Sequence, residues 1–329
     1  IDPWTSLSLN CSGNGCMDST ALNYDPTTTT DDGSCTYCIY GCMDPIAPNY
    51  DNSATCDDGS CSSPSVYGCM NSIAENYNTN ATFDNGSCTF IKTYVPDDIF
   101  EIWLEANGYG DGDPQNDSVI TATLVNINQL YLEYKGIADL TGVEDMTNMY
   151  YLVANGNNLT TVDLSSNTRL QYIYLNHNDS LSQIILPDSS LYSGNILYNF
   201  NANDCNISTI NLPNREISNI YLGGNPLINL DVSAVQGLQN LEVSNTNLTS
   251  LDLSNNTALQ YLYCYDMDNL TELDLRNGLS LLNLSNQSIY NNPNLSCISV
   301  SDLTIGASVL TNIDPWTSLS LNCSGNGCM

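Results

Sequence analysis

Apolar residues recur along most of the chain in a short pattern, LxxLxL followed two residues later by Asn, Cys or Thr, from about residue 126 onward. The second leucine-type position recurs in steps of 20 to 22 residues, with one step of 27. These positions are Leu130, Leu152, Ile173, Phe200, Ile220, Leu241, Leu262 and Leu282. We expect them to point inward from a column of short parallel strands.

A second apolar segment lies between consecutive members of this series. Examples are LTTVDL from Leu159, LINLDV from Leu227, LTSLDL from Leu248 and LTELDL from Leu270. Two short extended segments per turn, each with alternating apolar positions and Asn-rich corners, predict eight stacked coils of a β-solenoid rather than a helical array.

The N-terminal region has a different pattern, with three copies of a module of about 20 residues. They read GCMDSTALNYDPTTTTDDGSC from Gly15, GCMDPIAPNYDNSATCDDGSC from Gly41 and GCMNSIAENYNTNATFDNGSC from Gly68. Each copy places two cysteines 19 residues apart, which predicts the disulfides Cys16–Cys35, Cys42–Cys61 and Cys69–Cys88. Each bond would contribute on the order of 3 kcal/mol to a module too short to fold on its own core. Cys38 and Cys56 remain in the middle copy and are expected to pair.

Acidic and amide residues recur at fixed offsets in the modules. The acidic members are Asp18, Asp25, Asp31, Asp32, Asp44, Asp51, Asp57, Asp58 and Asp84, and the third copy has Asn71, Asn78 and Asn85 at three of the equivalent positions. Oxygen ligands on a glycine-containing loop suit calcium, the only cofactor that the sequence suggests. The alternative is that Asp and Asn form Asx turns before Gly33, Gly59 and Gly86. The third copy would be the weakest calcium site.

These modules resemble the cysteine-bracketed repeats of extracellular proteins from aquatic Bacteroidota, and the solenoid resembles the short leucine-rich repeats of secreted Bacteroidota proteins. TYVPDDIFEIWLEANGYGDGDPQND from Thr93 is similar to the helical N-terminal cap of that family, and NPNLSCISVSDLTIGASVLTNIDPWTSLSLNCS from Asn292 is similar to its C-terminal cap. The two cysteines of that cap usually bond, so the resemblance implies Cys297–Cys323. Local signals also predict a helix over residues 97–107, with Asp97 and Asp98 at the N-cap and Gly108 at its end.

The expected fold is therefore mainly β: a short-repeat leucine-rich-repeat solenoid with a helical N-cap and a disulfide C-cap, preceded by three small disulfide-stapled modules. The expected boundaries are residues 1–14 for the end of a preceding cap, 15–36, 37–62 and 66–90 for the modules, 93–125 for the N-terminal cap, 126–291 for the solenoid, 292–324 for the C-terminal cap and 325–329 for the start of a further module.

Residues 1–17, IDPWTSLSLNCSGNGCM, recur without change as residues 313–329, which gives a period of 312 residues. A repeat of this kind predicts a polymer of concatenated units, cut here through a mature secreted chain. A duplicated tag or an overlap between units is the alternative. In a polymer, Cys11 copies Cys323 and would bond in the preceding unit, while Cys328 copies Cys16 and would bond in the following one.

Composition narrows the possible partners. The chain has 36 Asp plus Glu against 5 Lys plus Arg, a net charge of −31, which argues against nucleic acid and anionic membranes as partners. Fourteen cysteines, concentrated in the modules, indicate an oxidising compartment. No run of about 20 apolar residues is present to span a membrane. We expect a secreted, extracellular or cell-surface protein.

An enzyme is not expected, because the single His, His177, lies beside a corner and no nucleophile elbow, phosphate loop or zinc motif occurs. A glycosidase is the remaining enzymatic alternative. Cys205 and Cys264 lie in the solenoid, where they are predicted to be buried structural thiols. Cys264 is assigned to the inward column of Leu175, Leu222, Val243 and Leu284, and Cys205 to the corner column of Asn157, Asn178 and Asn225.

Tyrosines are expected on the outer positions of the strands, where they could bind glycans or other cell-surface molecules. They are Tyr131, Tyr151, Tyr172, Tyr174, Tyr221, Tyr261, Tyr263 and Tyr265. The alternative is that strands simply favour Tyr. The longest insertion, residues 188–198, is a candidate contact or lateral interface.

Glycosylation is a further expectation. The sequons include Asn158, Asn247 and Asn255, and Ser19, Ser118 and Ser180 match the O-glycosylation pattern implied by the Bacteroidota resemblance. The leading hypothesis is a structural subunit of an extracellular fibre or stalk whose partners are identical units. The alternative is an adhesin that binds carbohydrate or protein on the solenoid face.

Overall fold

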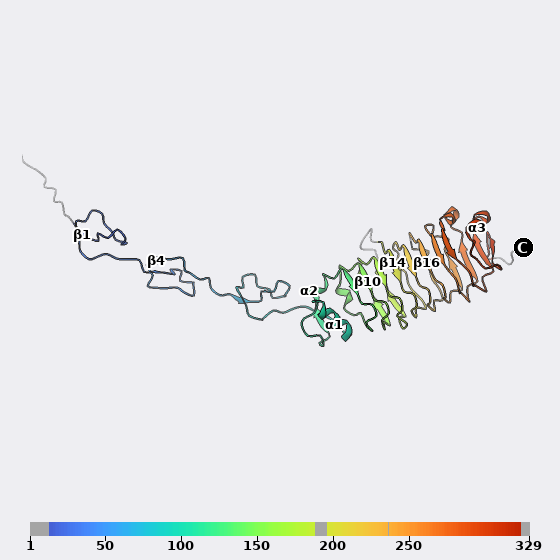
Figure 1. The fold of residues 1–329 in the computed structure, drawn as a ribbon, viewed down its shortest axis with the longest axis horizontal. Helices are drawn as coiled ribbons and strands as arrows, with labels where there is room; N and C mark the ends of the chain where they lie inside the picture. Colours follow the sequence, from blue (N-terminus) through green and yellow to red (C-terminus); the bar gives the residue numbers. More distant parts are fainter. Residues whose placement is uncertain (1–12, 188–195, 236, 324–329) are drawn as a thin grey trace, which may run out of the picture. The chain divides into compact units, whose positions relative to one another are not determined.

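The computed structural model describes residues 13–187, 196–235 and 237–323. The chain divides into two compact units, Ile1–Thr89 and Phe90–Met329, and each is described by itself (Figure 1). Within the described residues, no helix is long and apolar enough to cross a membrane, and the longest, α1, has nine residues.

Each N-terminal module is a loop built around one pair of very short parallel strands. The pairs are β1 (Asn14–Gly15) with β2 (Thr30–Asp31), β3 (Tyr40–Gly41) with β4 (Cys56–Asp57), and β5 (Tyr67–Gly68) with β6 (Phe83–Asp84). In each module the buried apolar side chains are little more than one bonded cysteine and one alanine, such as Cys42 and Ala47. So small a core cannot offset the entropy of folding, so the disulfide supplies the constraint that the core lacks.

The second unit is a series of stacked coils whose main wall is an eight-stranded parallel sheet (Figure 1). Its strands are β9 (Gln129–Tyr131), β10 (Tyr151–Val153), β12 (Tyr172–Tyr174), β14 (Asn199–Asn201), β15 (Asn219–Tyr221), β16 (Asn240–Glu242), β18 (Tyr261–Tyr263) and β20 (Asn286–Ser288). The expected inward positions from Leu130 to Leu262 lie opposite one another, and all seven are fully buried. The predicted β-solenoid is therefore confirmed.

The prediction of Leu282 as the eighth inward residue was wrong. Gln287, not Leu282, lies opposite Leu262, and Leu282 is exposed within the 3₁₀ helix η3 (Gly278–Asn283). That helix takes up extra residues, so the last coil is longer than its neighbours. For the same reason Ile289, rather than Leu284, occupies the column of Cys264, and Ile289 is fully buried.

The opposite wall of the solenoid is divided into two smaller parallel sheets. One pairs β11 (Thr161–Asp163) with β13 (Gln183–Ile185), and the other has the order β17 (Ser250–Asp252), β19 (Glu272–Leu275), β21 (Cys297–Val300) and β22 (Ser318–Ser320). Between them, the expected strand at residues 227–232 is absent, although Leu227, Leu230 and Val232 are buried. A groove lies between residues 182–186 and 208–213, where the backbone hydrogen bonding between successive strands of this wall is interrupted.

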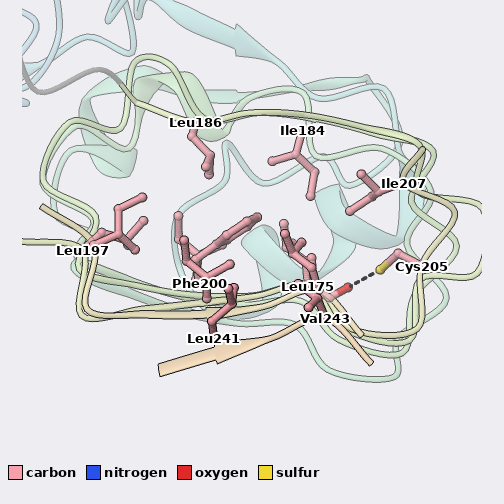
Figure 2. Close-up of a cluster of buried hydrophobic side chains, with 14 of the residues drawn as sticks. Leu175, Ile184, Leu186, Leu197, Phe200, Cys205, Ile207, Leu241 and Val243 are labelled. Carbon is pink, nitrogen blue, oxygen red and sulfur yellow. Dashed lines mark hydrogen bonds between the residues drawn. The ribbon is translucent and has the colours of Figure 1, made fainter. Parts of the chain in front are cut away.

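Apolar side chains from both walls meet in one continuous core (Figure 2). Ile184 and Leu186 come from one wall, and Phe200 and Leu241 come from the strands of the other. Each fully buried side chain of this size contributes about 1.5–3 kcal/mol relative to an exposed one. Repetition of the same contacts in successive coils makes this core the main source of stability in the second unit.

Caps close both ends of the core. At the N-terminal end, β7 (Lys92–Tyr94) pairs antiparallel with β8 (Ser118–Ile120), and the helices are α1 (Asp98–Ala106) and α2 (Thr121–Leu124). The prediction of a helix over residues 97–107 is confirmed within one residue at each end. Asp97 is the N-cap, and its Oδ1 accepts hydrogen bonds from Ile99 and Phe100. A short 3₁₀ helix, η1 (Val143–Asp145), follows in the first coil.

At the C-terminal end, β21 and β22 pair, α3 (Leu303–Val309) lies between them in sequence, and a disulfide joins Cys297 to Cys323. Sequence reasoning missed α3, although its signal is present. Asp302 precedes the helix and accepts hydrogen bonds from the backbone N–H groups of Thr304 and Ile305.

Candidate functional site

The solenoid turns one of its corners with a residue in the left-handed region in every coil. These residues are Tyr134, Gly156, His177, Asp204, Gly224, Asn245, Asp266 and Asn291, with φ between 52° and 69°. Each lies four residues after the inward residue of its strand, so the eight form a column. Gly, Asn and Asp suit this conformation, whereas Tyr134 and His177 adopt it against their intrinsic preference.

His177 is exposed at this corner, and its Nδ1 lies 3.4 Å from the Asp204 carboxylate in the next coil. Both side chains are about half exposed, at 52% and 55%. The structure therefore places the single His on a solvated column of corner residues, next to one carboxylate.

A second column, one residue further on, is buried and holds neighbouring coils together. Asn157, Asn178 and Asn225 each donate through Nδ2 to a carbonyl of their own coil and to one of the preceding coil. Their Oδ1 atoms accept backbone N–H groups, as Asn178 does from Leu159 at 3.2 Å. Buried backbone groups need hydrogen-bond partners, and this column supplies them to the N–H and C=O groups that strand pairing leaves unpaired at the corners. Asn292 extends the column beyond the positions that the sequence suggested.

Cys205 occupies this amide column, and its Sγ donates to the Leu175 carbonyl at 3.4 Å (Figure 2). Cys264 is fully buried among apolar residues. Burial raises the pKa of Cys205 to about 11 and that of Cys264 to about 12. Both are free thiols in the structure. A thiol held neutral in this way is a poor nucleophile, so neither group is placed for chemistry.

The tyrosines of the main sheet form a cluster on its first four strands. We call Tyr131, Tyr151, Tyr172, Tyr174 and Tyr198 the tyrosine cluster. Ring centroids are 5.6 Å apart for Tyr131 and Tyr151, 5.3 Å for Tyr151 and Tyr172, and 5.6 Å for Tyr172 and Tyr198. Such spacings are typical of favourable aromatic contacts. The cluster is a continuous, partly exposed aromatic surface on a polar sheet.

The environment of Tyr174 keeps its hydroxyl neutral. Burial, followed by the neighbouring tyrosines, raises the pKa of Tyr174 to about 12. Tyr131 and Tyr198 are exposed, at 45% and 40%, so their rings are available to a ligand. Neutral phenols on a flat surface can stack on a sugar ring while the hydroxyl groups exchange hydrogen bonds with its edge.

The remaining expected tyrosines lie further along the same sheet. Tyr221, Tyr261 and Tyr263 belong to β15 and β18, and Tyr265 stacks on Tyr290 with centroids 5.3 Å apart. Between the two groups, Asn199, Asn219 and Asn240 occupy the outer positions of three successive strands. Tyr198, Tyr150 and Tyr290 were not among the expected residues, because they lie outside the strand positions used to find them.

The candidate calcium ligands of the modules are engaged in local turns. Asp18, Asp25, Asp44 and Asp51 each accept a backbone N–H two residues later at 2.8–2.9 Å. Asp31, Asp32, Asp57, Asp58 and Asp84 do the same with N–H groups at or next to Gly33, Gly59 and Gly86. These bonds lower the pKa of several of them, Asp18 and Asp58 included. Calcium binding by the modules stays a prediction.

In the modules the structure brings the cysteines together as Cys16–Cys35, Cys38–Cys56, Cys42–Cys61 and Cys69–Cys88. Cys11, Cys328 and most of the insertion at 188–198 lie outside the described residues. Of the glycosylation candidates, Ser19, Ser180, Asn158, Asn247 and Asn255 are exposed, whereas Ser118 is half-buried and its hydroxyl donates to Asn116.

No family model matches this sequence. No curated protein matches it either. Among solved structures, the chain is similar to an internalin, InlF, of Listeria monocytogenes, with 20% identity over 69% of this chain and 71% of that chain and a TM-score of 0.46. It is also similar to internalin C2 of the same species, with 17% identity over 71% of this chain and 100% of that chain and a TM-score of 0.37.

A leucine-rich-repeat protein of Leptospira interrogans matches with 17% identity over 60% of this chain and 73% of that chain, at a TM-score of 0.30. The second unit is a leucine-rich-repeat β-solenoid. That assignment follows from its own strand register and core.

Proposed function

We propose that this chain is a repeating unit of a secreted, disulfide-stabilised fibre or surface stalk, in which 312-residue units follow one another in one polypeptide. The observation that carries the proposal is structural. Residues 313–323 of the duplicated stretch form the last layer of the C-terminal cap, and the same residues recur unchanged as 1–11.

Several contacts build the duplicated stretch into the cap. The Asp314 carboxylate accepts hydrogen bonds from the N–H groups of Asn291 and Asn292 at 2.8 Å each, and the Trp316 indole donates to the Asn292 carbonyl. Strand β22 pairs with β21, and Cys323 bonds to Cys297. Because solenoid ends expose unpaired strands, a sequence that covers such an end has a defined structural role. A second copy of that sequence supports the presence of a second cap.

The compartment is part of the same proposal. Five disulfides fit an oxidising environment outside the cytoplasm. The net charge of −31 favours mutual repulsion between lateral neighbours over close bundling at low ionic strength.

The test is to image native material and to map its disulfides without reduction. We expect filaments with an axial repeat of one unit, and Cys11 in a peptide bonded to the Cys297 sequence of the preceding unit. A control is the 329-residue chain produced alone, in which the Cys11 peptide lacks that partner. A native particle of one unit, or an unbonded Cys11 in native material, would refute the proposal.

A second function, adhesion through carbohydrate binding, is favoured by the tyrosine cluster. Its rings are in mutual contact and partly exposed on a sheet whose other outer residues are mainly polar. This function is compatible with the fibre, because a stalk built of such units would repeat the same surface many times and gain avidity.

A glycan array probed with the 329-residue chain tests this second function. We expect Tyr131→Ala combined with Tyr172→Ala to weaken binding of any retained glycan by about five- to 150-fold, since aromatic contacts contribute about 0.5–1.5 kcal/mol each. Tyr50→Ala, at a tyrosine of the second module that is 45% exposed like Tyr131, is the matched control. Equal binding by the double variant and the control would exclude the cluster as the site.

A further inference from the structure

The N-terminal cap of the solenoid brings three carboxylates together, apart from the surfaces described above. Asp98 and Glu101 lie one turn apart on α1, and Asp117 lies just before β8. One oxygen atom of each carboxylate lies within 4.8 Å of the other two. Residues three apart on a helix share a face, so α1 presents its two carboxylates to the same point.

Glu101 is the unusual member of the group because its side chain is fully buried, with a relative exposure of 0%. Its Oε1 accepts hydrogen bonds from the N–H groups of Asn116 and Ser118 at 3.3 and 3.1 Å. Its Oε2 is buried without a hydrogen-bond partner among the described residues. A buried carboxylate oxygen that lacks a donor is costly unless a positive charge or a proton balances it.

The backbone around Asp117 holds the third carboxylate in place. Glu101 binds the N–H groups on either side of this residue, and the Asp117 carbonyl accepts a hydrogen bond from Val95 at 2.9 Å. Asp117 has a φ of 55°, in the left-handed region. Three backbone hydrogen bonds therefore hold the left-handed conformation that places the Asp117 side chain beside Glu101.

Among the described residues, no ion pair joins a protein cation to any of the three carboxylates. The Lys92 ammonium group pairs with Asp111 at 2.6 Å and acts on Glu101 only at longer range. The side chains of Asp98 and Asp117 are exposed and accept no hydrogen bond from the described part of the chain, so their oxygens are open to an ion from solution. The arrangement is one buried, oriented ligand with two accessible ones.

We propose that Asp98, Glu101 and Asp117 bind a hard divalent cation, calcium in preference to magnesium, at the N-terminal cap. Calcium accepts six to eight oxygen ligands at about 2.3–2.6 Å in a flexible geometry, whereas magnesium requires a near-ideal octahedron at about 2.0–2.1 Å, so three carboxylates from two separate segments suit calcium better. Water completes the coordination. The ion joins α1 to the segment before β8 and so fixes the cap that covers the first coil. This site is independent of the proposed fibre.

Calcium titration of the full 329-residue chain tests the proposal, with the melting temperature of the solenoid and terbium luminescence as readouts. Trp103 on α1 is close enough in sequence to the ligands to sensitise a terbium ion bound there. We expect calcium at 100 times its dissociation constant to raise the melting temperature by about 5–11 °C. Calcium should also displace the terbium.

Variants at the ligands should remove both effects. Glu101→Gln and Asp117→Asn each should weaken calcium binding at least tenfold, and Asn tolerates the left-handed backbone at residue 117. Asp98→Asn, at an exposed position, provides the same test if Glu101→Gln fails to fold. Asp113→Asn, in the same loop but outside the group, and Asp44→Asn, in the second module, should bind calcium at the cap as the unmodified chain does.

Two results would overturn the site. One is unchanged calcium binding in both Asp98→Asn and Asp117→Asn. The other is a higher melting temperature for Glu101→Gln without calcium, together with no effect of calcium on the unmodified chain, which would show that a proton rather than a metal ion balances Oε2.

Discussion

The thiol of Cys205 lies 3.4 Å from the carbonyl oxygen of Leu175, at the position where neighbouring coils place an asparagine amide. In the preceding coil, Asn178 donates to two carbonyl groups, those of Ala154 and Leu175, at 3.0 and 2.7 Å. A thiol has one weak donor and an amide has two strong ones. The amide column is therefore weaker at Cys205 than at Asn178 or Asn225.

Cys205→Asn should strengthen this coil. The new amide would donate to the Leu175 and Ala202 carbonyl groups, which are equivalent to the two that Asn178 reaches one coil earlier, and we expect the free energy of unfolding to rise by about 1 kcal/mol. Urea unfolding followed by circular dichroism measures the change. Cys205→Ala, which removes the remaining donor, should lower stability instead, and an opposite order of the two variants would contradict the role assigned to the column.

Stability of the solenoid should fall at alkaline pH because Cys264 is buried as a neutral thiol. Its pKa is raised from 9.0 to about 12. The unfolded chain therefore ionises first, so the stabilisation is fully present below about pH 9 and is lost progressively between pH 9 and 12. At pH 10.5 the loss from this thiol is about 2 kcal/mol.

Urea midpoints at pH 8 and pH 10.5 check this expectation. The matched variant is Cys264→Val, because Val243 occupies the same column in the preceding coil and is equally buried. Its stability should depend less steeply on pH than that of the unmodified chain. Equal pH dependence in the two proteins would show that Cys264 does not set the alkaline limit.

Asp97 should couple the N-terminal cap to the first coil. Its Oδ1 caps α1, and its Oδ2 accepts hydrogen bonds from Ala138 and Asp139 at 2.7 and 3.1 Å. Asp97→Ala removes both functions and should cost about 2 kcal/mol. Asp97→Asn keeps an oxygen for the helix but turns an NH₂ group toward two N–H donors, so it should cost less than Asp97→Ala. Thermal unfolding monitored by calorimetry measures both. Equal costs would mean that only the bonds to Ala138 and Asp139 matter, and no cost for Asp97→Asn would mean that only the helix cap matters.

Asp58→Asn should separate turn formation from calcium binding in the modules. Asn85, at the equivalent position of the third module, accepts from Ser87 N at 3.0 Å, much as Asp58 accepts from Ser60 N at 2.9 Å. The fold of the second module should therefore survive the substitution at neutral pH, as judged by resistance to proteolysis. Calcium affinity of the modules, if calorimetry detects any, should fall.

The same variant has a defined pH dependence. Interactions with the Ser60 side chain and backbone N–H lower the pKa of Asp58. The folded module thus gains from the charged form above the unfolded pKa of about 4, and this gain is lost as the pH falls through the folded value. Asp58→Asn removes that acid sensitivity, so proteolysis rates of the variant should change less between pH 7 and pH 3.

The sequence predicts the repeated part of the fold well, because each coil must bury the same face. Phe200 was placed correctly in spite of the 27-residue step, since the apolar pattern resumes directly after the insertion. The last coil was misregistered because LSLLNLS offers several leucines, and the register follows Ile289 and Asn292, whose packing is visible only in three dimensions.

The candidate sites were harder to predict for physical reasons. Tyr134 and His177 adopt left-handed backbone conformations that their residue types do not favour, because the stack of coils imposes the corner against local preference. Glu101 is one of 36 acidic residues, and nothing local distinguishes it from the others. What distinguishes Glu101 is its burial beneath the loop at Asn116 and Ser118, which only the folded structure shows.

The bond between Cys297 and Cys323 also determines how the chain would carry mechanical load. A pull that reaches Cys323 from beyond the cap passes directly through sulfur to Cys297 and does not stretch the 26-residue span between them. Cys16–Cys35, Cys42–Cys61 and Cys69–Cys88 shield their own loops in the same way. Under tension the residues enclosed by these disulfides would stay folded, because the bonds carry the force past them. The extensible length of the chain would come from the solenoid coils and the short links between modules.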